Sequence, residues 1–302
     1  MTIRLVLIAF KKLEPEDFRV LNAIERGMAH GLYVQVEVIS KLSGLPLEEV
    51  EVRLRKLNTL GLVQRRKGAF TGYTLTSRGY DCLALNALRK RGTLTHISSS
   101  PIGTGKESDV YMGLTPSGRR VTVKMHRVGR VSFRQARKVR VYVGDRRHVS
   151  WLYLSRLAAK TEYEALRLLY PEKIAVPEPV DWNRHIVVTG FIEGVELYKV
   201  PELPDPRSVM ERIIDEVIKC YNRVGIVHGD LSEYNVLVTK NNDIVIFDWP
   251  QWVSKEHPSA LILLKRDLEN ILAFFKRKYR VRVNVDEEVS RIVSELEGRE
   301  HP

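Results

Sequence analysis

The stretch His228-Gly-Asp-Leu-Ser-Glu-Tyr-Asn235 decides how the rest of the chain is interpreted. It separates an aspartate, Asp230, from an asparagine, Asn235, by four residues, and the alternating segment Val236-Leu-Val-Thr239 follows. Phosphoryl transfer needs a carboxylate near the nucleophile and an amide oxygen on a metal ion, and this loop supplies both groups. We therefore interpret it as a catalytic loop. The alternative is a chance alignment of polar loop residues.

A second carboxylate follows at the end of the next strand. The segment after Asn235 and the segment Asp243-Ile-Val-Ile-Phe247 alternate on either side of Lys240-Asn-Asn242, which predicts a hairpin. Asp248 comes directly after the second strand. Together with Asp230 and Asn235 it offers oxygen ligands of the kind that Mg²⁺ prefers. The sequence therefore predicts a site for one or two magnesium ions.

A loop that contains two glycines lies upstream, in Gly103-Thr-Gly-Lys-Glu-Ser-Asp-Val-Tyr111. Glycine lets the backbone approach phosphate oxygens, and successive amides can point at the anion. A Walker A loop is excluded because Lys106 is followed by Glu107 rather than by serine or threonine. Taken alone, the loop is equally typical of a tight hairpin. However, Val121-Thr-Val-Lys124 then alternates like a strand and ends in lysine, which is the order found in protein kinases.

These motifs, in this order, resemble the RIO family of atypical serine/threonine protein kinases over roughly residues 95–280. Gly103-Thr-Gly-Lys-Glu-Ser108 is similar to the family's phosphate loop, in which serine replaces the third glycine, and the catalytic loop is close to a family signature. Asp248-Trp-Pro-Gln251 and a winged helix at the N-terminus resemble the second RIO branch. Two positions depart from the family pattern, because Trp249 stands where phenylalanine is usual and Gly190 where an acidic residue is expected.

The resemblance implies an ATP and Mg²⁺ site, residue by residue. Lys124 would contact the α and β phosphates and pair with Glu162, with Glu164 as the competing choice. Asp230 would be the catalytic aspartate, and Asn235 and Asp248 would be metal ligands. Asp248 would also be catalytic as a phosphoryl acceptor, which gives a transient aspartyl-phosphate, and the alternative is that it is a metal ligand only. The residues expected at the nucleotide are Gly105, Lys106, Glu107, Ser108, Val110, Lys124, Glu162, Gly190 and Ile192.

The first 90 residues or so read as a winged-helix domain. The expected elements are helices over Asp17–Ile24, Val34–Leu42 and Pro46–Gly61, strands over Leu62–Arg66 and Phe70–Leu75, and a helix from Thr76 through Leu88. Three helices, a two-stranded wing and a closing helix are typical of this relative of the helix-turn-helix. Gly61 stands where a helix-ending glycine is expected.

Charge points to a polyanionic partner. The chain has 49 lysines and arginines against 37 acidic residues, a net charge of +12, and a pI near 9.6. Cations lie on the third helix and the wing of the N-terminal domain, at Arg53, Arg55, Lys56, Arg65, Arg66 and Lys67. Residues 127–147 hold eight more with one acid, Asp145, and resemble the family's flexible insertion; Ser132 within it is a candidate autophosphorylation site. Both regions favour contact with RNA, and a solvated or protein-docking face is the alternative.

The sequence therefore predicts an α+β protein with a winged-helix domain at residues 1–92 and a two-lobed RIO kinase domain at 93–302. The N-lobe is expected at about 93–188 and the C-lobe at about 189–302. The resemblance implies an ATP- and Mg²⁺-dependent serine/threonine kinase or ATPase that acts in maturation of the small ribosomal subunit, with the subunit precursor and its RNA as partners. The alternatives are a classical protein kinase, a nucleotide-binding pseudo-enzyme, and an ATP-sensing nucleic-acid-binding regulator.

Two cysteines, Cys82 and Cys220, exclude a disulfide framework and favour a reducing compartment. The early apolar run Leu5–Phe10 is far shorter than the roughly 20 residues that span a bilayer, and it lacks the features of a signal peptide. We therefore expect a soluble, cytoplasmic protein with no membrane partner and no disulfide partner.

Overall fold

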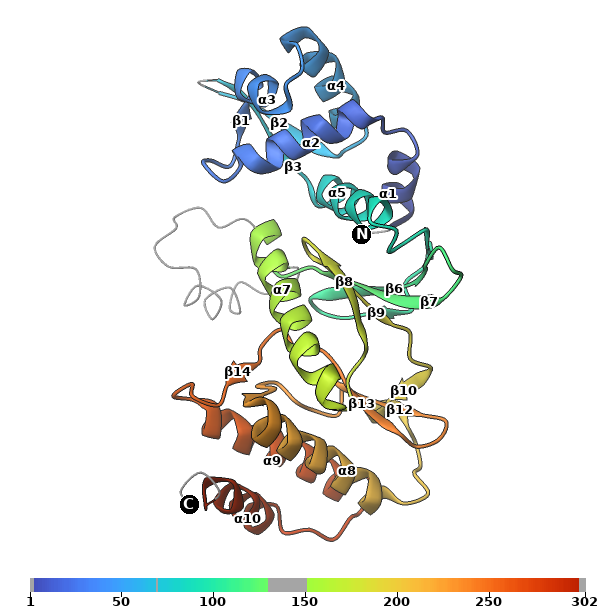
Figure 1. Ribbon diagram of the computed structural model, residues 1–302, viewed down its shortest axis with the longest axis vertical. Helices are drawn as coiled ribbons and strands as arrows, with labels where there is room; N and C mark the ends of the chain where they lie inside the picture. The colour runs from blue at the N-terminus through green and yellow to red at the C-terminus, as the bar shows by residue number, and fades with distance from the viewer. Residues whose placement is uncertain (1–2, 69, 130–150, 299–302) are drawn as a thin grey trace. The chain divides into compact units, whose positions relative to one another are not determined.

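The structure, a computed structural model, describes residues 3–68, 70–129 and 151–298 (Figure 1). The chain divides into two compact units. Unit 1 comprises Met1–Leu157 with Trp182–Ile186, and unit 2 comprises Ala158–Asp181 with Val187–Pro302. The mixture of helices and sheets agrees with the predicted α+β class. The domain boundaries near residues 92 and 188 stay predictions.

The N-terminal part of unit 1 is a winged helix. Its helices are α1 (Ile3–Phe10), α2 (Pro15–Gly27), α3 (Val36–Ser43), α4 (Leu47–Thr59) and α5 (Ser77–Lys90), and its strands are β1 (Val34–Gln35), β2 (Val63–Lys67) and β3 (Thr71–Leu75). The strands form an antiparallel sheet in the order β1-β3-β2. Gly61, with φ +68°, takes the left-handed conformation directly after α4, as predicted.

Two details of this domain differ from the prediction. The helix expected from Val34 begins at Val36, because Val34 and Gln35 pair with Tyr73 and Gly72 of β3. The apolar run near the N-terminus forms the helix α1, whose buried Val6 packs in the region of α5. Burial of this apolar face outweighs the weak helix signal of so short a segment.

The rest of unit 1 is built on an antiparallel sheet. Its strands are β4 (His96–Ile97), β5 (Gly103–Thr104), β6 (Ser108–Leu114) and β7 (Arg120–His126), and β4 and β5 both pair with β6. Buried and half-buried residues alternate along β6, so one face of that strand meets the core. The turn between β8 (Pro179–Asn183) and β9 (Ile186–Gly190) also belongs to unit 1, where the His126 N–H donates to the His185 carbonyl over 2.9 Å. Helix α7 (Trp151–Leu169) contains residues of both units.

Unit 2 combines two small sheets with three long helices. The strands β10 (Gly194–Glu196), β12 (Val236–Thr239) and β13 (Ile244–Ile246) form one antiparallel sheet, and β11 (Ile226–Val227) pairs with β14 (Val253–Ser254). The helices are α8 (Pro206–Lys219), α9 (Ala260–Lys278) and α10 (Val285–Gly298), with the short turns η1 (Tyr170–Glu172), η2 (Leu197–Lys199) and η3 (Cys220–Val224). The predicted hairpin after Asn235 is confirmed as β12–β13.

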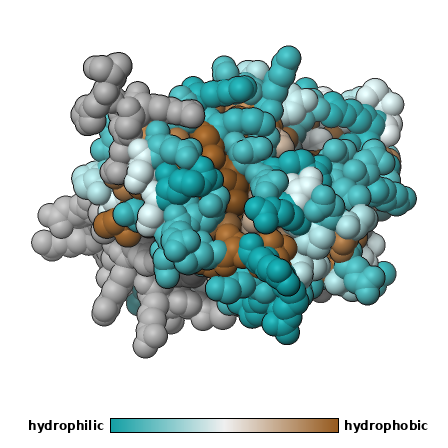
Figure 2. Space-filling model, turned by 90° about the horizontal axis from the view of Figure 1, so that it is seen from below, coloured by the Kyte–Doolittle hydropathy of each residue, from teal (hydrophilic) through white to brown (hydrophobic). Residues whose placement is uncertain are grey.

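Helix α9 buries one continuous face. Leu268, Ile271, Leu272 and Phe275 are each at most 1% exposed. Figure 2 shows one side of the molecule, where hydrophilic residues cover most of the visible surface and hydrophobic residues appear in strips between them. None of the helices in the described ranges is long and apolar enough to cross a membrane.

Candidate active site

The loop between β11 and β12 holds two of the predicted site residues, Asp230 and Asn235. Gly229 begins the loop with φ +77°, and a Cβ atom there would lie 2.7 Å from the carbonyl oxygen of Gln251. The position therefore requires glycine on both conformational and steric grounds. The Nδ2 of Asn235 donates to the Asp230 carbonyl over 2.8 Å, which fixes the orientation of the amide and distinguishes its oxygen, a possible metal ligand, from its nitrogen. Asp230 itself is exposed, and Gln251 Nε2 lies 3.4 Å from its Oδ2.

Asp248 is tied to the same loop through its neighbours. The backbone N–H of Phe247 donates to the Asn235 carbonyl over 3.0 Å. Asp248 has φ +69°, a conformation that residues other than glycine rarely adopt and that clusters at functional sites. Trp249 is 1% exposed, and its indole N–H donates to the Ile246 carbonyl over 3.1 Å. The tryptophan that departs from the family pattern is thus a packing residue, and it anchors the segment that carries Asp248.

His228 links the two segments. The Asp230 N–H donates to His228 Nδ1 over 3.3 Å, so Nε2 carries the proton and donates to the Phe247 carbonyl over 3.2 Å. Its ring lies 4.4 Å from that of Trp249. The imidazole is 4% exposed, so it orients the backbone on both sides of the site.

Asp267 of α9 is a site residue that the sequence analysis missed. Its Oδ2 accepts from the Gly229 N–H over 2.7 Å, and its Oδ1 accepts from the Leu231 N–H over 2.9 Å. Two neighbours on the helix hold the carbonyls of the same two residues, since Arg266 donates to Gly229 and Asn270 donates to Leu231. The catalytic loop is therefore fastened to α9 on both sides of Asp230. The sequence signal that could have identified it is an aspartate on the apolar face of an amphipathic helix.

Burial raises the pKa of Asp267 to about 7, although the two backbone N–H groups oppose the rise. The folded protein therefore holds a proton here that the unfolded chain has lost, and this group's contribution to stability falls as the pH rises from about 4 to 7. We expect Asp267→Asn to gain stability relative to the wild type, by on the order of 2 kcal/mol, between pH 5 and pH 8. Urea unfolding of both proteins at the two pH values measures this, and parallel pH profiles would contradict it.

The residues of this loop and of the Asp248 segment fit a magnesium ion. Asp230, Asn235 and Asp248 offer only oxygen donors, and the orientation of the Asn235 amide presents oxygen rather than nitrogen. In the described parts of the chain no group of three or more histidines, cysteines, aspartates or glutamates forms a metal site. The chemistry of these oxygen donors therefore fits a hard cation.

The predicted residues of the glycine loop, together with Lys124, lie in unit 1 on the β5–β6–β7 sheet. The Gly105 N–H donates to the Ser108 carbonyl over 2.8 Å and closes a tight turn that contains Lys106 and Glu107. Val110 of β6 lies directly opposite Lys124 of β7, so their side chains share one face of the sheet. The glycine loop and the strand lysine therefore belong to one hairpin, as the sequence predicts.

Three further predicted residues, Glu162, Gly190 and Ile192, also lie in unit 2. Glu162 is 4% exposed, whereas Glu164 is exposed and pairs with Lys160 over 3.4 Å. A buried carboxylate requires a partner, so burial favours Glu162 over Glu164 as the functional residue. Gly190 ends β9, and its N–H donates to the Glu178 carbonyl over 2.9 Å. Ile192 follows and is half-buried.

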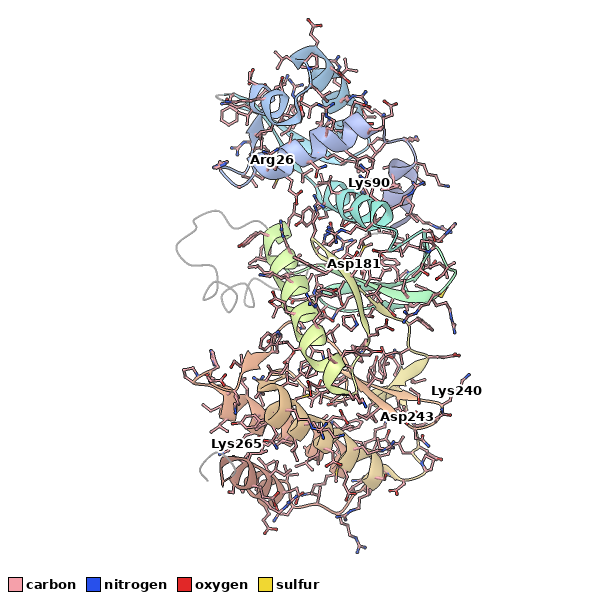
Figure 3. The ribbon with its side chains drawn as sticks, in the orientation of Figure 1. Arg26, Lys90, Asp181, Lys240, Asp243 and Lys265 are labelled. Atoms are coloured by element: carbon pink, nitrogen blue, oxygen red, sulfur yellow. The ribbon has the colours of Figure 1, made fainter. Side chains whose placement is uncertain are left out.

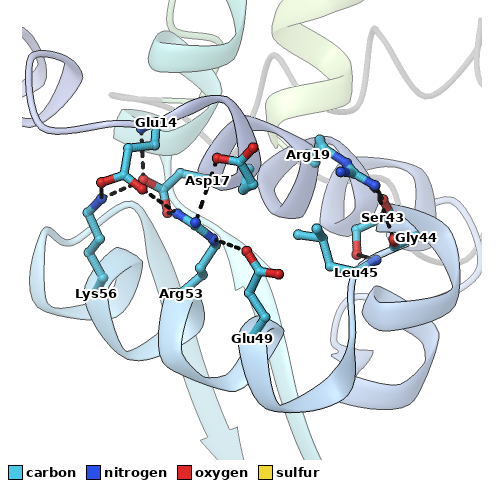
Figure 4. Close-up of polar contacts among 10 residues, drawn as sticks. Glu14, Asp17, Arg19, Ser43, Gly44, Leu45, Glu49, Arg53 and Lys56 are labelled. Atoms are coloured by element: carbon cyan, nitrogen blue, oxygen red, sulfur yellow. Dashed lines mark hydrogen bonds and ion pairs between the residues drawn. The ribbon is translucent and has the colours of Figure 1, made fainter.

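Two of the predicted cations of the winged helix form ion pairs with acidic side chains (Figure 4). Arg53 lies 3.1 Å from Asp17 and 2.9 Å from Glu14, and Lys56 Nζ lies 2.6 Å from Asp17. These contacts fasten α4 to the start of α2, so the two side chains act in folding of the domain. The other four predicted cations, Arg55, Arg65, Arg66 and Lys67, are exposed.

The basic stretch at residues 127–147 is described only at its start. Arg127 is not an exposed cation, because its guanidinium forms a buried ion pair with Asp81. Its exclusion from solvent follows from this carboxylate on α5, which local sequence does not reveal. The other seven cations and Ser132 lie outside the described residues.

Comparison with known proteins covers both domains. The RIO domain family matches residues 109–288, and the family described as Rio2, N-terminal, matches residues 10–91. The RIO-type serine/threonine-protein kinase Rio2 of Methanocaldococcus jannaschii is 41% identical over 84% of this chain and 93% of its own length. Serine/threonine-protein kinase rio2 of Schizosaccharomyces pombe is 34% identical over 97% of this chain and 86% of its own. The crystal structure of the Rio2 kinase–ADP/Mg²⁺–phosphoaspartate complex from Chaetomium thermophilum superposes with a TM-score of 0.80 at 34% identity and covers 91% of this chain and 84% of that one.

Proposed function

The chain belongs to the RIO family of serine/threonine-protein kinases and carries the Rio2 N-terminal domain, and from this membership we propose that it transfers the γ-phosphoryl group of ATP by way of Asp248. The observation that carries the proposal is the fastening of Asp230, Asn235 and the Asp248 segment to one another by backbone and amide hydrogen bonds. The Rio2 kinase of Chaetomium thermophilum, in a complex with ADP, Mg²⁺ and phosphoaspartate, supports it.

Each residue has a role in this scheme. The Asn235 amide oxygen and the Asp248 carboxylate would hold Mg²⁺, which would neutralise charge on the phosphates when bound. A carboxylate oxygen of Asp248 forms a bond to the γ-phosphorus as the bond from that phosphorus to the β-phosphate oxygen breaks, and ADP leaves. Asp230 then accepts a proton from the water molecule, or from the serine or threonine hydroxyl, that attacks the aspartyl-phosphate. Attack by water gives ATP hydrolysis, and attack by a hydroxyl gives protein phosphorylation.

The nucleotide would be held by the loop and strands already described. Lys124 and the backbone amides at Gly105–Ser108 would contact the phosphates, and Val110 would also contact the nucleotide. Because the Gly190 N–H is engaged with Glu178, Gly190 would recognise adenine through its carbonyl, and Ile192 through its N–H. Glu162 would be the carboxylate partner of Lys124.

A single-turnover reaction with γ-labelled ATP and Mg²⁺ tests the proposal. The purified protein alone is quenched, and protein-bound label is divided into base-labile and base-stable fractions. Base-labile label that appears before free phosphate supports an aspartyl-phosphate. Label found only on serine, or no label in the absence of a protein substrate, would mean that Asp248 is a magnesium ligand alone, and the chain would then act as a direct serine/threonine kinase.

We further propose that the partner is the precursor of the small ribosomal subunit and that the wing contacts its RNA, with the protein acting in the cytoplasm. The net charge of +12 supports a polyanionic partner. On the wing, Arg65 and Lys67 are exposed, and Arg66 stacks over the Tyr33 ring at 5.3 Å, so the cations lie beside an aromatic side chain. Cations together with aromatic rings are a common platform for single-stranded nucleic acid.

Neutralising the wing tests this contact. Replacing Arg65, Arg66 and Lys67 together by glutamine removes up to three phosphate contacts, so the slope of log K against log salt falls by about 2 for single-stranded RNA. Fluorescence anisotropy with a single-stranded RNA oligonucleotide over a salt series measures it. The control replaces three exposed cations of unit 2, Arg207 together with Lys240 and Lys265, and loses the same charge. Lys240 and Lys265 are labelled in Figure 3. Equal slopes in the two triple variants would show that binding follows net charge rather than the wing.

A further inference from the structure

A buried ion pair joins the winged helix to the end of β7. The guanidinium of Arg127 donates to both carboxylate oxygens of Asp81 on α5, over 2.6 and 2.9 Å. His185 Nε2 lies 2.8 Å from the same carboxylate, and Arg127 Nε lies 3.5 Å from Asp109 of β6. The side chains of Asp81 and Arg127 are only 2% and 14% exposed. One aspartate of α5 therefore holds the end of β7 and the β8–β9 turn at the same time.

The Asp81 carboxylate and the Arg127 guanidinium carry opposite charges at neutral pH. Burial alone would raise the pKa of Asp81, but Arg127 and His185 together lower it to about 2, so the carboxylate is charged at neutral pH. A buried ion pair gives little net stability, because desolvation of the two charges offsets their attraction. Apolar residues of similar volume often serve stability equally well. The bidentate contact between guanidinium and carboxylate instead fixes the orientation of the Arg127 side chain.

The backbone of Arg127 transmits this orientation to the glycine loop. Its N–H donates to the carbonyl of Glu107 over 2.6 Å, immediately beyond the paired residues Ser108 and His126. Glu107 lies inside the turn that the Gly105–Ser108 hydrogen bond closes. The residue whose side chain is anchored in α5 is thus the residue whose main chain holds the loop.

We propose that Asp81 and Arg127 are positioning residues, through which the winged-helix domain holds the Gly103–Ser108 loop in the conformation that receives the ATP phosphates. Neither side chain touches the reacting atoms. The part of the inference that concerns ATP rests on the function proposed above, whereas the part that concerns loop order does not. Loss of the pair loosens the loop, so nucleotide binding weakens while the chemical step, which depends on unit 2 residues, is retained.

The test separates positioning from stability. In Asp81→Leu/Arg127→Met the two charges are replaced together, so neither of these two is left buried without the other. The contacts of His185 and Asp109 with the pair are lost as well, and the fold is expected to persist. We expect backbone amide exchange at Gly105 and at residue 127, whose N–H remains, to rise about tenfold in the nucleotide-free protein, equivalent to about 1.4 kcal/mol. KM for ATP rises about tenfold with kcat within about twofold, a split that a purely structural role would not produce.

A matched control and a second variant complete the design. Glu25 and Arg184 form another ion pair between the winged helix and the β8–β9 turn, with contacts of 2.9 and 2.5 Å, but with no bond to the loop. Glu25→Leu/Arg184→Met should leave loop exchange and KM unchanged. If the first double variant does not fold, Arg127→Lys keeps the buried charge but loses the two-pronged contact, and loop exchange should still rise. Unchanged amide exchange of the loop in the folded variant would overturn the inference. A wild-type protein that fails to bind MgATP would contradict the proposed function instead. In that case the amide-exchange result alone would decide whether Asp81 and Arg127 position the loop.

Discussion

Replacing Asp230 with asparagine is expected to lower the turnover of ATP at least ~100-fold while MgATP binding is retained, because the general base for attack on the aspartyl-phosphate is lost. Asparagine keeps the size of the side chain, and its amide oxygen can still accept the 3.4 Å contact from Gln251. It cannot accept the proton of the attacking water or hydroxyl. The loop itself persists, because its position depends on Asp267 and on the carbonyl of residue 230 rather than on the Asp230 carboxylate.

Single-turnover rates and calorimetric binding of MgATP measure the two halves of this prediction. Asp243→Asn is the matched control, because Asp243 is an exposed aspartate at the β12–β13 turn (Figure 3) and the same charge is removed from unit 2. The control should behave as the wild type. A turnover in Asp230→Asn that equals that of the control would remove Asp230 from the mechanism, whatever the binding constants show.

The parts of the fold and site that could be predicted from the sequence are those encoded by short-range order. Asp230 and Asn235 occur in one loop, and the alternation on either side of Lys240–Asn242 predicts the hairpin that leads to Asp248. The glycine loop and Lys124 occupy one hairpin for the same reason, since the β6–β7 turn is short. The spacing of Leu268, Ile271, Leu272 and Phe275 is that of an amphipathic helix, and these residues form the buried face of α9.

The parts that could not be predicted depend on partners distant in the sequence. Asp267 lies on an apolar helix face, and only the fold shows that its carboxylate caps two N–H groups of a loop 36 and 38 residues away. Arg127 belongs by composition to an exposed basic stretch, yet Asp81, 46 residues earlier, buries it. Arg53 and Lys56 likewise carry the charge expected of a nucleic-acid-binding helix, but they pair with Asp17. Charge can be counted from sequence, whereas its neutralisation requires the fold.

The backbone at Asp248 determines which substitution tests its role. With φ +69°, the position is strained for most side chains, and asparagine is among the few residues that tolerate this conformation. Alanine would add backbone strain to the loss of the carboxylate. Asparagine removes the nucleophile and keeps an oxygen for Mg²⁺, and the segment stays anchored by Trp249, which is buried beside His228. Asp248→Asn therefore separates the acceptor role from folding.

We expect Asp248→Asn to form no base-labile protein-bound phosphate and to release phosphate from ATP at least ~100-fold more slowly than the wild type, because an amide cannot act as the nucleophile. Thermal unfolding within a few degrees of the wild type shows that the fold is intact. Asp230→Asn provides the contrast: because Asp230 acts in the second step, base-labile label should accumulate in that variant and decay slowly. Base-labile label that persists in Asp248→Asn would move the acceptor to another carboxylate. Serine-bound label at the wild-type rate would show that Asp248 holds the metal and that the hydroxyl attacks ATP directly.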